Sequence, residues 1–249
     1  TFTTGEVYNI DKTAPFVSSV VRADSNPTNA SSVQFTVTFS ESVTGVDASD
    51  FTLTTSGVSG ASITNFSGSG TFYLVTVNTG SGDGTIRLDV LDDDSITDGL
   101  NTLSAGFTTG DVYNVNKSIP NVVSVVRADS NPTNATSVQY TVTFSESVTG
   151  VDSDDFTLTT SGVSGASITD ISGSGTTYTV TVGTGSNDGT IRLDVLDDDT
   201  ITDGANALTS TFTTGEFYTI NKSIPNVVSV IRADSDPTNA SSARFTVTF

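Results

Sequence analysis

Apolar and polar residues alternate along short segments of this chain, and the alternation predicts β-strands. Phe, Val and Phe at positions 35, 37 and 39 alternate with two threonines, which is the period of two typical of a half-buried strand. A second alternating segment runs from Ile86 to Val90. No segment of useful length shows helical periodicity, and the abundant Gly, Ser, Thr and Asn residues are poor helix formers. The pattern therefore predicts an all-β protein.

The same pattern returns at a fixed interval. The phrase Arg-Ala-Asp-Ser begins at Arg22, Arg127 and Arg232, which gives two equal intervals of 105 residues. Equal intervals mean that no residue is inserted or deleted between copies. A period of this length is too long for a solenoid repeat and fits whole domains in tandem.

The period divides the chain into four parts. Residues 1–12 match the last strand of a repeat, and residues 223–249 match the first strands of another. Residues 13–117 and 118–222 are complete repeats, here called the first and second repeat. Because the partial copies flank complete ones, we expect a longer repetitive protein on both sides.

Seven strands are predicted for the first repeat. They cover residues 16–23, 33–39, 51–54, 61–66, 73–77, 86–90 and 107–115. Gly68-Ser-Gly70 is predicted to form a tight hairpin connection, and the last strand is predicted to bulge near Gly110. Seven strands with frequent turn signals predict tandem seven-stranded immunoglobulin-like (Ig-like) β-sandwiches, arranged head to tail.

The odd number of strands has a mechanical consequence. The first and last strands of a repeat run in the same direction, so the chain is expected to enter at one end and leave at the other. The linkers, residues 9–15 and 114–120, are short and end in proline. Proline fixes its own φ angle and restricts the preceding residue, so we predict stiff joints.

Three phrases resemble a known group of proteins. They are Val37-Thr-Phe-Ser-Glu-Ser-Val-Thr-Gly, Ser49-Asp-Phe-Thr-Leu and Gly5-Glu-Val-Tyr-Asn-Ile-Asp-Lys-Thr-Ala-Pro15. The chain resembles, over its whole length, the bacterial Ig-like domain repeats of large cell-surface and adhesin-type proteins. The resemblance implies an extracellular or bacterial cell-surface location. It also implies a stalk that carries other modules outward.

Composition and charge narrow the function. The chain has 28 acidic and 9 basic residues, a net charge of −19, and no His or Cys. Such a charge repels nucleic acid and anionic membranes, and no apolar run approaches the ~18 residues of a membrane span. Without His and Cys, the common nucleophile–base pairs are missing. A carboxylate pair could serve a glycosidase, but near-identical repeats bearing the same acidic loops favour a structural role, and we predict that the chain is not an enzyme.

The acidic loops are the candidate metal sites. The loops 40–50 and 92–101 are expected at the end where the linker enters, so their carboxylates can converge. The predicted ligands are Glu41, Asp47, Asp50, Asp92, Asp94 and Asp98, and in the second repeat Glu146, Asp152, Asp155, Asp197, Asp199 and Asp203. Clustered carboxylates and carbonyls suit Ca²⁺, which would stiffen the junctions. The alternative is that these residues are solvated loop ends, because no EF-hand pattern is present.

Other charged residues leave similar alternatives open. Asp24 and Asp83, at the opposite end of the first repeat, either add ligands across a joint or cap turns. Lys12, Lys117 and Lys222 occur once per repeat. Some surface Ig-like domains form Lys–Asn crosslinks, but a lysine in a linker favours the interpretation of a solvated charge.

These observations predict a structural function. We expect a stiff spacer within an extracellular fibre or adhesin stalk, with neighbouring copies of the repeat as partners and lateral self-assembly into a filament as an extension. The alternative is an Ig-like binding module that recognises a glycan or protein through its loops. The loops contain no aromatic cluster, which favours the spacer.

Overall fold

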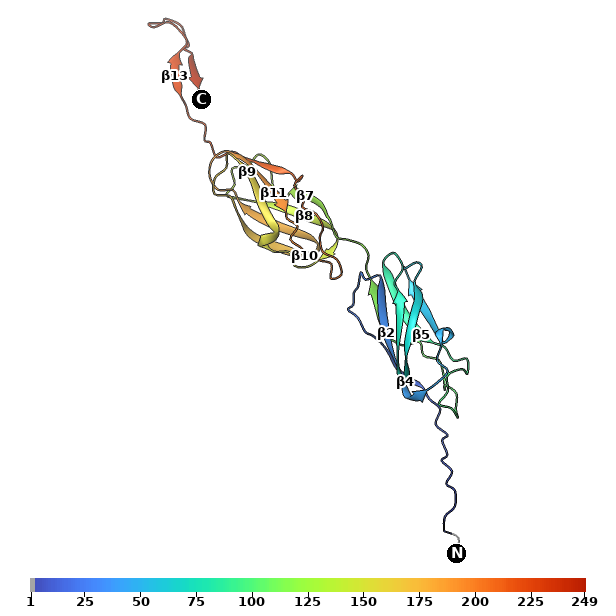
Figure 1. The fold of residues 1–249 in the computed structure, drawn as a ribbon. Helices are drawn as coiled ribbons and strands as arrows, with labels where there is room; N and C mark the ends of the chain where they lie inside the picture. The colour runs from blue at the N-terminus through green and yellow to red at the C-terminus, as the bar shows by residue number, and fades with distance from the viewer. Residues whose placement is uncertain (1–2) are drawn as a thin grey trace. The chain divides into compact units, whose positions relative to one another are not determined.

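The computed structural model describes residues 3–249; Thr1 and Phe2 of the predicted leading segment lie outside the described residues. Antiparallel strands dominate these residues, and their helical elements are two single 3-10 turns, Ala48–Asp50 and Ser153–Asp155 (Figure 1). No helix in this part of the chain is both long and apolar enough to cross a membrane.

The chain divides into two compact units. Among the described residues, the first contains residues 3–120, Val148–Gly150 and Asp199–Thr209. The second contains Asn121–Ser147, Val151–Asp198 and Ser210–Phe249.

Each repeat is built from two three-stranded antiparallel sheets. The first repeat comprises β1 (Val17–Arg22), β2 (Ser32–Val43), β3 (Phe51–Ser56), β4 (Ser62–Asn78), β5 (Gly84–Val90) and β6 (Val112–Val115). The sheets have the orders β1-β2-β4 and β3-β5-β6. Their inner faces share one hydrophobic core, as in an Ig-like sandwich.

The second repeat has the same strand order. It comprises β7 (Val122–Arg127), β8 (Ser137–Val148), β9 (Phe156–Ser161), β10 (Ser167–Gly183), β11 (Gly189–Val195) and β12 (Phe217–Ile220). Its sheets are β10-β8-β7 and β12-β11-β9. A further antiparallel pair, β13 (Ser229–Arg232) and β14 (Phe245–Thr248), follows.

The long strand β4 contains a chain reversal. The Thr64 hydroxyl donates to the Thr76 carbonyl at 3.2 Å, although twelve residues of extended strand would separate them by about 40 Å. Gly68 and Gly70 lie between them with φ angles of 142° and 67°. A Cβ atom at Gly68 would lie 2.3 Å from the carbonyl oxygen of Phe72. The predicted hairpin is therefore confirmed.

The alternating pattern places the core. Phe35, Val37 and Phe39 are buried on β2, whereas the threonines between them are only half-buried. The ring of Phe35 meets that of Tyr113 edge to face, with centroids 4.9 Å apart. Each large apolar side chain buried in this way stabilises the fold by about 1.5–3 kcal/mol.

Strand β2 is longer than predicted. It continues through Ser40 and Glu41 to Val43, so Glu41 lies on a strand and the acidic loop begins at Thr44. Val43 is buried, and its carbonyl accepts a hydrogen bond from the Tyr73 hydroxyl at 3.2 Å. The hydrogen bond holds the end of β2 in place. The alternation of apolar and polar residues does not predict it, so the extension of the strand was missed.

The last strand is shorter than predicted, because β6 covers only Val112–Val115 and Phe107 pairs through a single bridge, with the predicted irregularity near Gly110 between them. Val90 bridges to Phe107, and Arg87 pairs with Val112. Between these two pairs, the chain that leads into β6 has two more residues than β5. A Cβ atom at Gly110 would lie 2.8 Å from that of Val20. Glycine is therefore needed where the bulge approaches β1.

The chain enters and leaves the first repeat at opposite ends of β2. On entry, the Phe16 carbonyl accepts a hydrogen bond from the Ser40 amide at 2.9 Å, near the end of β2. On exit, the Asn116 amide donates to the Thr28 carbonyl at 2.9 Å, just before β2 begins. The 12 residues of β2 span about 40 Å. The repeat therefore carries the chain from one of its ends to the other.

Candidate functional site: the two ends of a repeat

The exit end holds the outgoing linker through one carboxylate. Oδ1 of Asp83 accepts hydrogen bonds from the amides of Lys117 at 2.5 Å and Ser118 at 3.0 Å, and its Oδ2 accepts from the Ser118 hydroxyl at 2.5 Å. Asp83 lies in the loop between β4 and β5. We call Asp83, Lys117 and Ser118 the linker clamp. It fixes the first residues of the linker on the repeat that they leave.

The lysine of the clamp donates to main-chain carbonyls of the same repeat. Nζ of Lys117 donates to the carbonyls of Asn29 and Ala30, both at 2.6 Å. The buried Thr79 hydroxyl donates to the same Ala30 carbonyl at 2.6 Å. The sequence did not predict these hydrogen bonds, because a linker position says nothing of nearby carbonyls; they are exposed, so the interpretation of Lys117 as a solvated charge is not overturned.

The second repeat has the same clamp. Asp188 accepts from the Lys222 amide at 2.5 Å, the Ser223 amide at 3.0 Å and the Ser223 hydroxyl. Nζ of Lys222 donates to the Asn134 and Ala135 carbonyls at 2.9 and 2.5 Å. The arrangement thus occurs separately in both units.

Ionisation of the clamp carboxylates is favoured. The hydroxyl of Ser118 and then the amide of Lys117 lower the pKa of Asp83 below its ordinary value. The hydroxyl of Ser223 and the amide of Lys222 lower the pKa of Asp188 in the same way. Hydrogen bonds donated to a carboxylate stabilise its charged form, so both clamps are complete at neutral pH.

The entry end gathers three acidic residues. Carboxylate oxygens of Asp11, Glu41 and Asp98 all lie within 4.8 Å of one another. Desolvation raises the pKa of Glu41, and the charges of Asp11 and Asp98 raise it further. Glu41 and Asp98 were predicted from the acidic loops, but Asp11 was not, because that residue lies in the linker.

Asp98 also has a structural role. Its Oδ1 accepts from the amides of Leu100 and Asn101 at 2.6 and 2.7 Å. The side chain and amide of Asn101 and the amide of Leu100 lower the pKa of Asp98. The Asn101 side chain in turn donates to the Thr13 carbonyl at 3.1 Å, so this turn also holds the incoming linker.

Two other predicted ligands in the first repeat are caps. Asp47 and Asp50 form a capping box around the 3-10 turn. Asp50 is fully buried and accepts from the Asp47 amide at 2.5 Å and the Ser95 hydroxyl at 2.6 Å. The last two predicted ligands of the first repeat lie in the loop after β5. Asp92 is exposed, and Asp94 accepts a hydrogen bond from the Thr102 hydroxyl at 3.2 Å.

The three clustered carboxylates fit one Ca²⁺ ion in spacing. Oxygens that share an ion at 2.3–2.6 Å lie no more than about 5 Å apart, and those of Asp11, Glu41 and Asp98 meet this limit. The ion needs 6–8 oxygen ligands, so loop carbonyls or water would supply the others. Calcium binding stays a prediction.

The second repeat differs at the linker position. Asn116 replaces Asp11 in the alignment of repeats, and its Nδ2 donates to Asp203 at 3.1 Å. Its Oδ1 is buried without a hydrogen-bond partner among the described residues, as is Oδ1 of Asp197. Asp152 and Asp155 form a capping box like that of the first repeat. Of the remaining predicted ligands, Glu146 lies on β8. Asp199 lies in the loop after β11 and has a φ angle of 66°.

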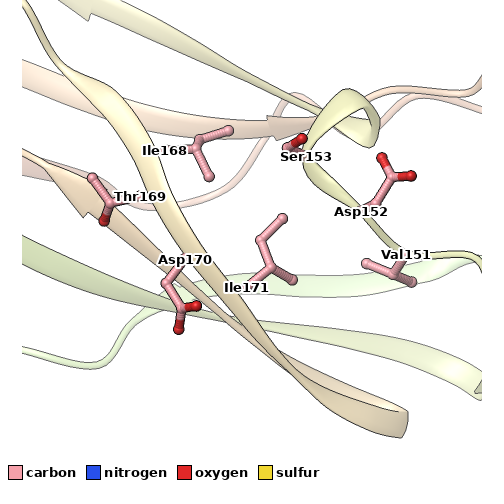
Figure 2. A pocket seen from close by; sticks show the side chains of 7 residues that line it. All are labelled: Val151, Asp152, Ser153, Ile168, Thr169, Asp170 and Ile171. Atoms are coloured by element: carbon pink, nitrogen blue, oxygen red, sulfur yellow. The ribbon is translucent and has the colours of Figure 1, made fainter.

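An open pocket of about 430 Å³ lies beside β10. Its lining residues are Val151, Asp152, Ser153, Ile168, Thr169, Asp170 and Ile171. Figure 2 shows that they come from two segments, the turn that includes Ser153 and the strand that carries Ile168 and Ile171. In the first repeat the position of Ile171 is held by Phe66, which packs against Phe51 with ring centroids 6.2 Å apart. Ile171 is the smaller of the two side chains.

Comparison with solved structures supports the fold. The chain is similar to the Escherichia coli adhesin FdeC, with 17% identity and a TM-score of 0.51 over 92% of this chain and 72% of that one. Two Yersinia pseudotuberculosis proteins, InvD and the adhesin InvE, also match at 17% identity, with TM-scores of 0.36 and 0.28. They cover 90% and 82% of this chain, and 65% and 58% of their own. These two scores are too low to carry an argument.

No family model matches the chain, and no curated protein is similar to it at a significant level. The fold is nevertheless defined by its strands and by the similarity to FdeC. The chain is an all-β protein of Ig-like sandwiches, and its fold is similar to that of the bacterial adhesin FdeC.

Proposed function

We propose that this chain is the repeat region of an extracellular bacterial surface protein, in which each repeat acts as a spacer. The observation that carries the proposal is the path of the chain through one repeat. It enters beside the end of β2 and leaves beside its start. A domain crossed in this way adds its own length to the chain, whereas one that returned the chain to its starting end would add little.

The linker clamp explains how direction would be kept. Backbone bonds to Thr28 and side-chain bonds to Asp83 make the linker up to Ser118 part of the preceding repeat. Only Ile119 separates Ser118 from Pro120, whose φ angle is fixed and which restricts the residue before it. Few backbone torsions are then free between one repeat and the next, which favours a stiff joint.

The charge also favours a spacer on a cell surface. The net charge of −19 keeps the chain soluble and makes its repeats repel one another. Repulsion between repeats favours extension over folding back. It also opposes binding to anionic surfaces such as nucleic acid.

The alternative function is a binding module. The pocket beside Ile168 and Ile171 is the feature that would serve it in the second repeat. A glycan array and a pull-down with the 249-residue chain separate the two functions. Micromolar binding that is lost in an Ile171→Phe variant, which copies the first repeat, would favour the binding module.

Small-angle X-ray scattering of the 249-residue chain tests the spacer. The wild type is compared with the double clamp variant Asp83→Ala/Asp188→Ala and with the loop control Asp92→Ala. We expect the clamp variant to show more interdomain flexibility while the control matches the wild type. Identical scattering from all three proteins would contradict a role of the clamp in stiffness.

A further inference from the structure

The outer face of the β1-β2-β4 sheet in the first repeat carries exposed apolar side chains. Phe72 is 60% exposed and Val21 is 40% exposed, and Leu74, two residues after Phe72, is half-buried on the same face. Residues on alternate positions of β4, such as Tyr73 and Val75, are buried on the inner face. The outer face is therefore more apolar than a solvated sheet surface requires.

The strand register joins these residues into one patch. Thr36 pairs with Val21 on one side and Leu74 on the other, and Thr38 pairs with Phe72. Neighbouring strands lie about 4.8 Å apart, so the five side chains form a continuous surface. We call these five residues the outer patch.

The outer patch is uncharged in a strongly acidic protein. None of its members is Asp, Glu, Lys or Arg, and the next outward residues, Ser19 and Gln34, are also neutral. The chain as a whole carries a net charge of −19. Two copies that approach through most other surfaces bring like charges together, whereas two outer patches meet without that repulsion.

We propose that the outer patch packs against the outer patch of a second copy of this chain. The contact is sheet on sheet, with the two faces about 10 Å apart, and it is isologous because the same residues face each other. Phe72 supplies the large apolar contact, as aromatic residues do at the centre of interfaces. The partner is a second copy because an uncharged apolar face is complementary to itself.

The second repeat lacks the apolar half of this surface. The equivalents of Phe72 and Leu74 are Thr177 and Thr179. Both threonines lie on the outward side of β10, and Thr177 is exposed. Lateral pairing is therefore assigned to the first repeat. A repeat with Phe and Leu at these two positions pairs, whereas a repeat with two threonines there does not. This inference specifies the lateral self-assembly expected from the sequence and does not need the spacer function, because an extended chain that stays monomeric would overturn only the pairing.

Analytical ultracentrifugation of the 249-residue chain over a range of concentrations tests the pairing. We expect a concentration-dependent dimer whose dissociation constant rises at least tenfold in Phe72→Thr/Leu74→Thr. These substitutions copy the second repeat, so they keep the fold. Val126→Thr, on the equivalent face of the second repeat, is the matched control and should leave the dissociation constant unchanged.

A gain of function completes the test. Thr177→Phe/Thr179→Leu gives the second repeat the same surface, and we expect tighter association with species larger than dimers. A wild type that stays monomeric at millimolar concentration overturns the proposal, as does association that is equal in Phe72→Thr/Leu74→Thr. Glycan binding by the monomer that is lost in the same variant would assign the patch to a glycan and also overturn it.

Discussion

The hydroxyl of Tyr113 donates a hydrogen bond to the main-chain carbonyl of Gln34 at 2.7 Å. The same hydroxyl accepts from the Asp24 amide at 2.8 Å, and the guanidinium of Arg22 lies 5.9 Å from the centre of the tyrosine ring. One side chain of β6 therefore ties together both strands that open the repeat. Tyr218 makes the same contacts in the second repeat.

We expect Tyr113→Phe to destabilise the first repeat by about 1–3 kcal/mol, because it leaves a carbonyl and an amide without their partner. Urea-induced unfolding followed by circular dichroism measures the change. The ring and its packing against Phe35 are retained, so the effect isolates the hydroxyl. A change below the error of the measurement would show that water replaces the hydroxyl without cost.

Tyr140→Phe in the second repeat is the matched comparison. The Tyr140 hydroxyl donates to the Ile191 carbonyl at 2.6 Å in the core, and burial raises the pKa of Tyr140. The first repeat has Phe35 at this position, which shows that the fold accepts the loss. We expect a cost of about 1 kcal/mol or less, and a larger cost than that of Tyr113→Phe would contradict this ranking.

The linker clamp should depend on pH with a defined sign. The folded pKa of Asp83 lies below its ordinary value of 3.8, so the stabilisation is present above the ordinary value and is lost as the pH falls through the folded pKa. We expect the amides of Lys117 and Ser118 to be protected from hydrogen exchange at pH 6. Exchange at these amides, corrected for intrinsic rates, should accelerate below pH about 4.

Asp83→Ala should remove this protection at every pH, and Asp92→Ala should not. Equal protection of the Lys117 and Ser118 amides in the wild type and Asp83→Ala would show that backbone bonds alone hold the linker. Lys222 and Ser223 provide the second copy of the test, with Asp188→Ala as the variant.

Gly110→Ala should destabilise the first repeat through overpacking. The added Cβ atom would lie 2.8 Å from the Cβ atom of Val20 and 2.9 Å from its carbonyl oxygen. Moving a main-chain atom of β1 costs about 1–3 kcal/mol, which thermal unfolding would show. Gly5→Ala, where a Cβ atom would meet nothing within 4 Å, is the control. Equal melting temperatures of the two variants would contradict the close approach.

The acidic cluster predicts opposite effects with and without Ca²⁺. The pKa of Glu41 is raised above 4.5 by desolvation and by Asp11 and Asp98, so its charge destabilises the fold at neutral pH, and stability increases as the pH falls through the folded pKa. In EDTA at low salt, Glu41→Gln should therefore raise the melting temperature. With Ca²⁺ the wild type should gain stability and Glu41→Gln should gain less.

The two parts of this prediction fail separately. A wild-type melting temperature that is the same in EDTA and in Ca²⁺ would end the calcium prediction but leave the repulsion intact. A lower melting temperature of Glu41→Gln in EDTA would show that the cluster is held by contacts rather than strained by charge.

Sequence alone predicted the strands whose two faces differ. Alternation placed β1, β3 and β5 within a few residues, because one face of each is buried. The end of β2 was missed, since Ser40 and Glu41 do not continue the alternation and the strand is held there by Val43. A bulge near Gly110 was predicted, but the strand around it was expected to cover residues 107–115, whereas β6 covers only Val112–Val115.

The site was predicted less well because its contacts join distant segments. The residues Lys117 and Asp83 are 34 positions apart, and nothing in their local sequence marks them as partners. Asp11 was overlooked for the same reason, although Glu41 and Asp98 were named. Asp50 was taken for a ligand because a buried cap and a metal ligand use the same residue type. One signal in the sequence could have indicated the linker clamp, because its carboxylate, Asp83, is kept as Asp188 at the equivalent position of the second repeat.

The most direct measurement is the maximum dimension of proteins that contain two, four and six complete repeats, determined by small-angle scattering and electron microscopy. A repeat that the chain crosses from end to end should add a constant length of about 40 Å, the span of β2. Equal increments per repeat are the predicted result. A maximum dimension that stops growing after the first repeats, as in a chain that folds back on itself, would contradict the account.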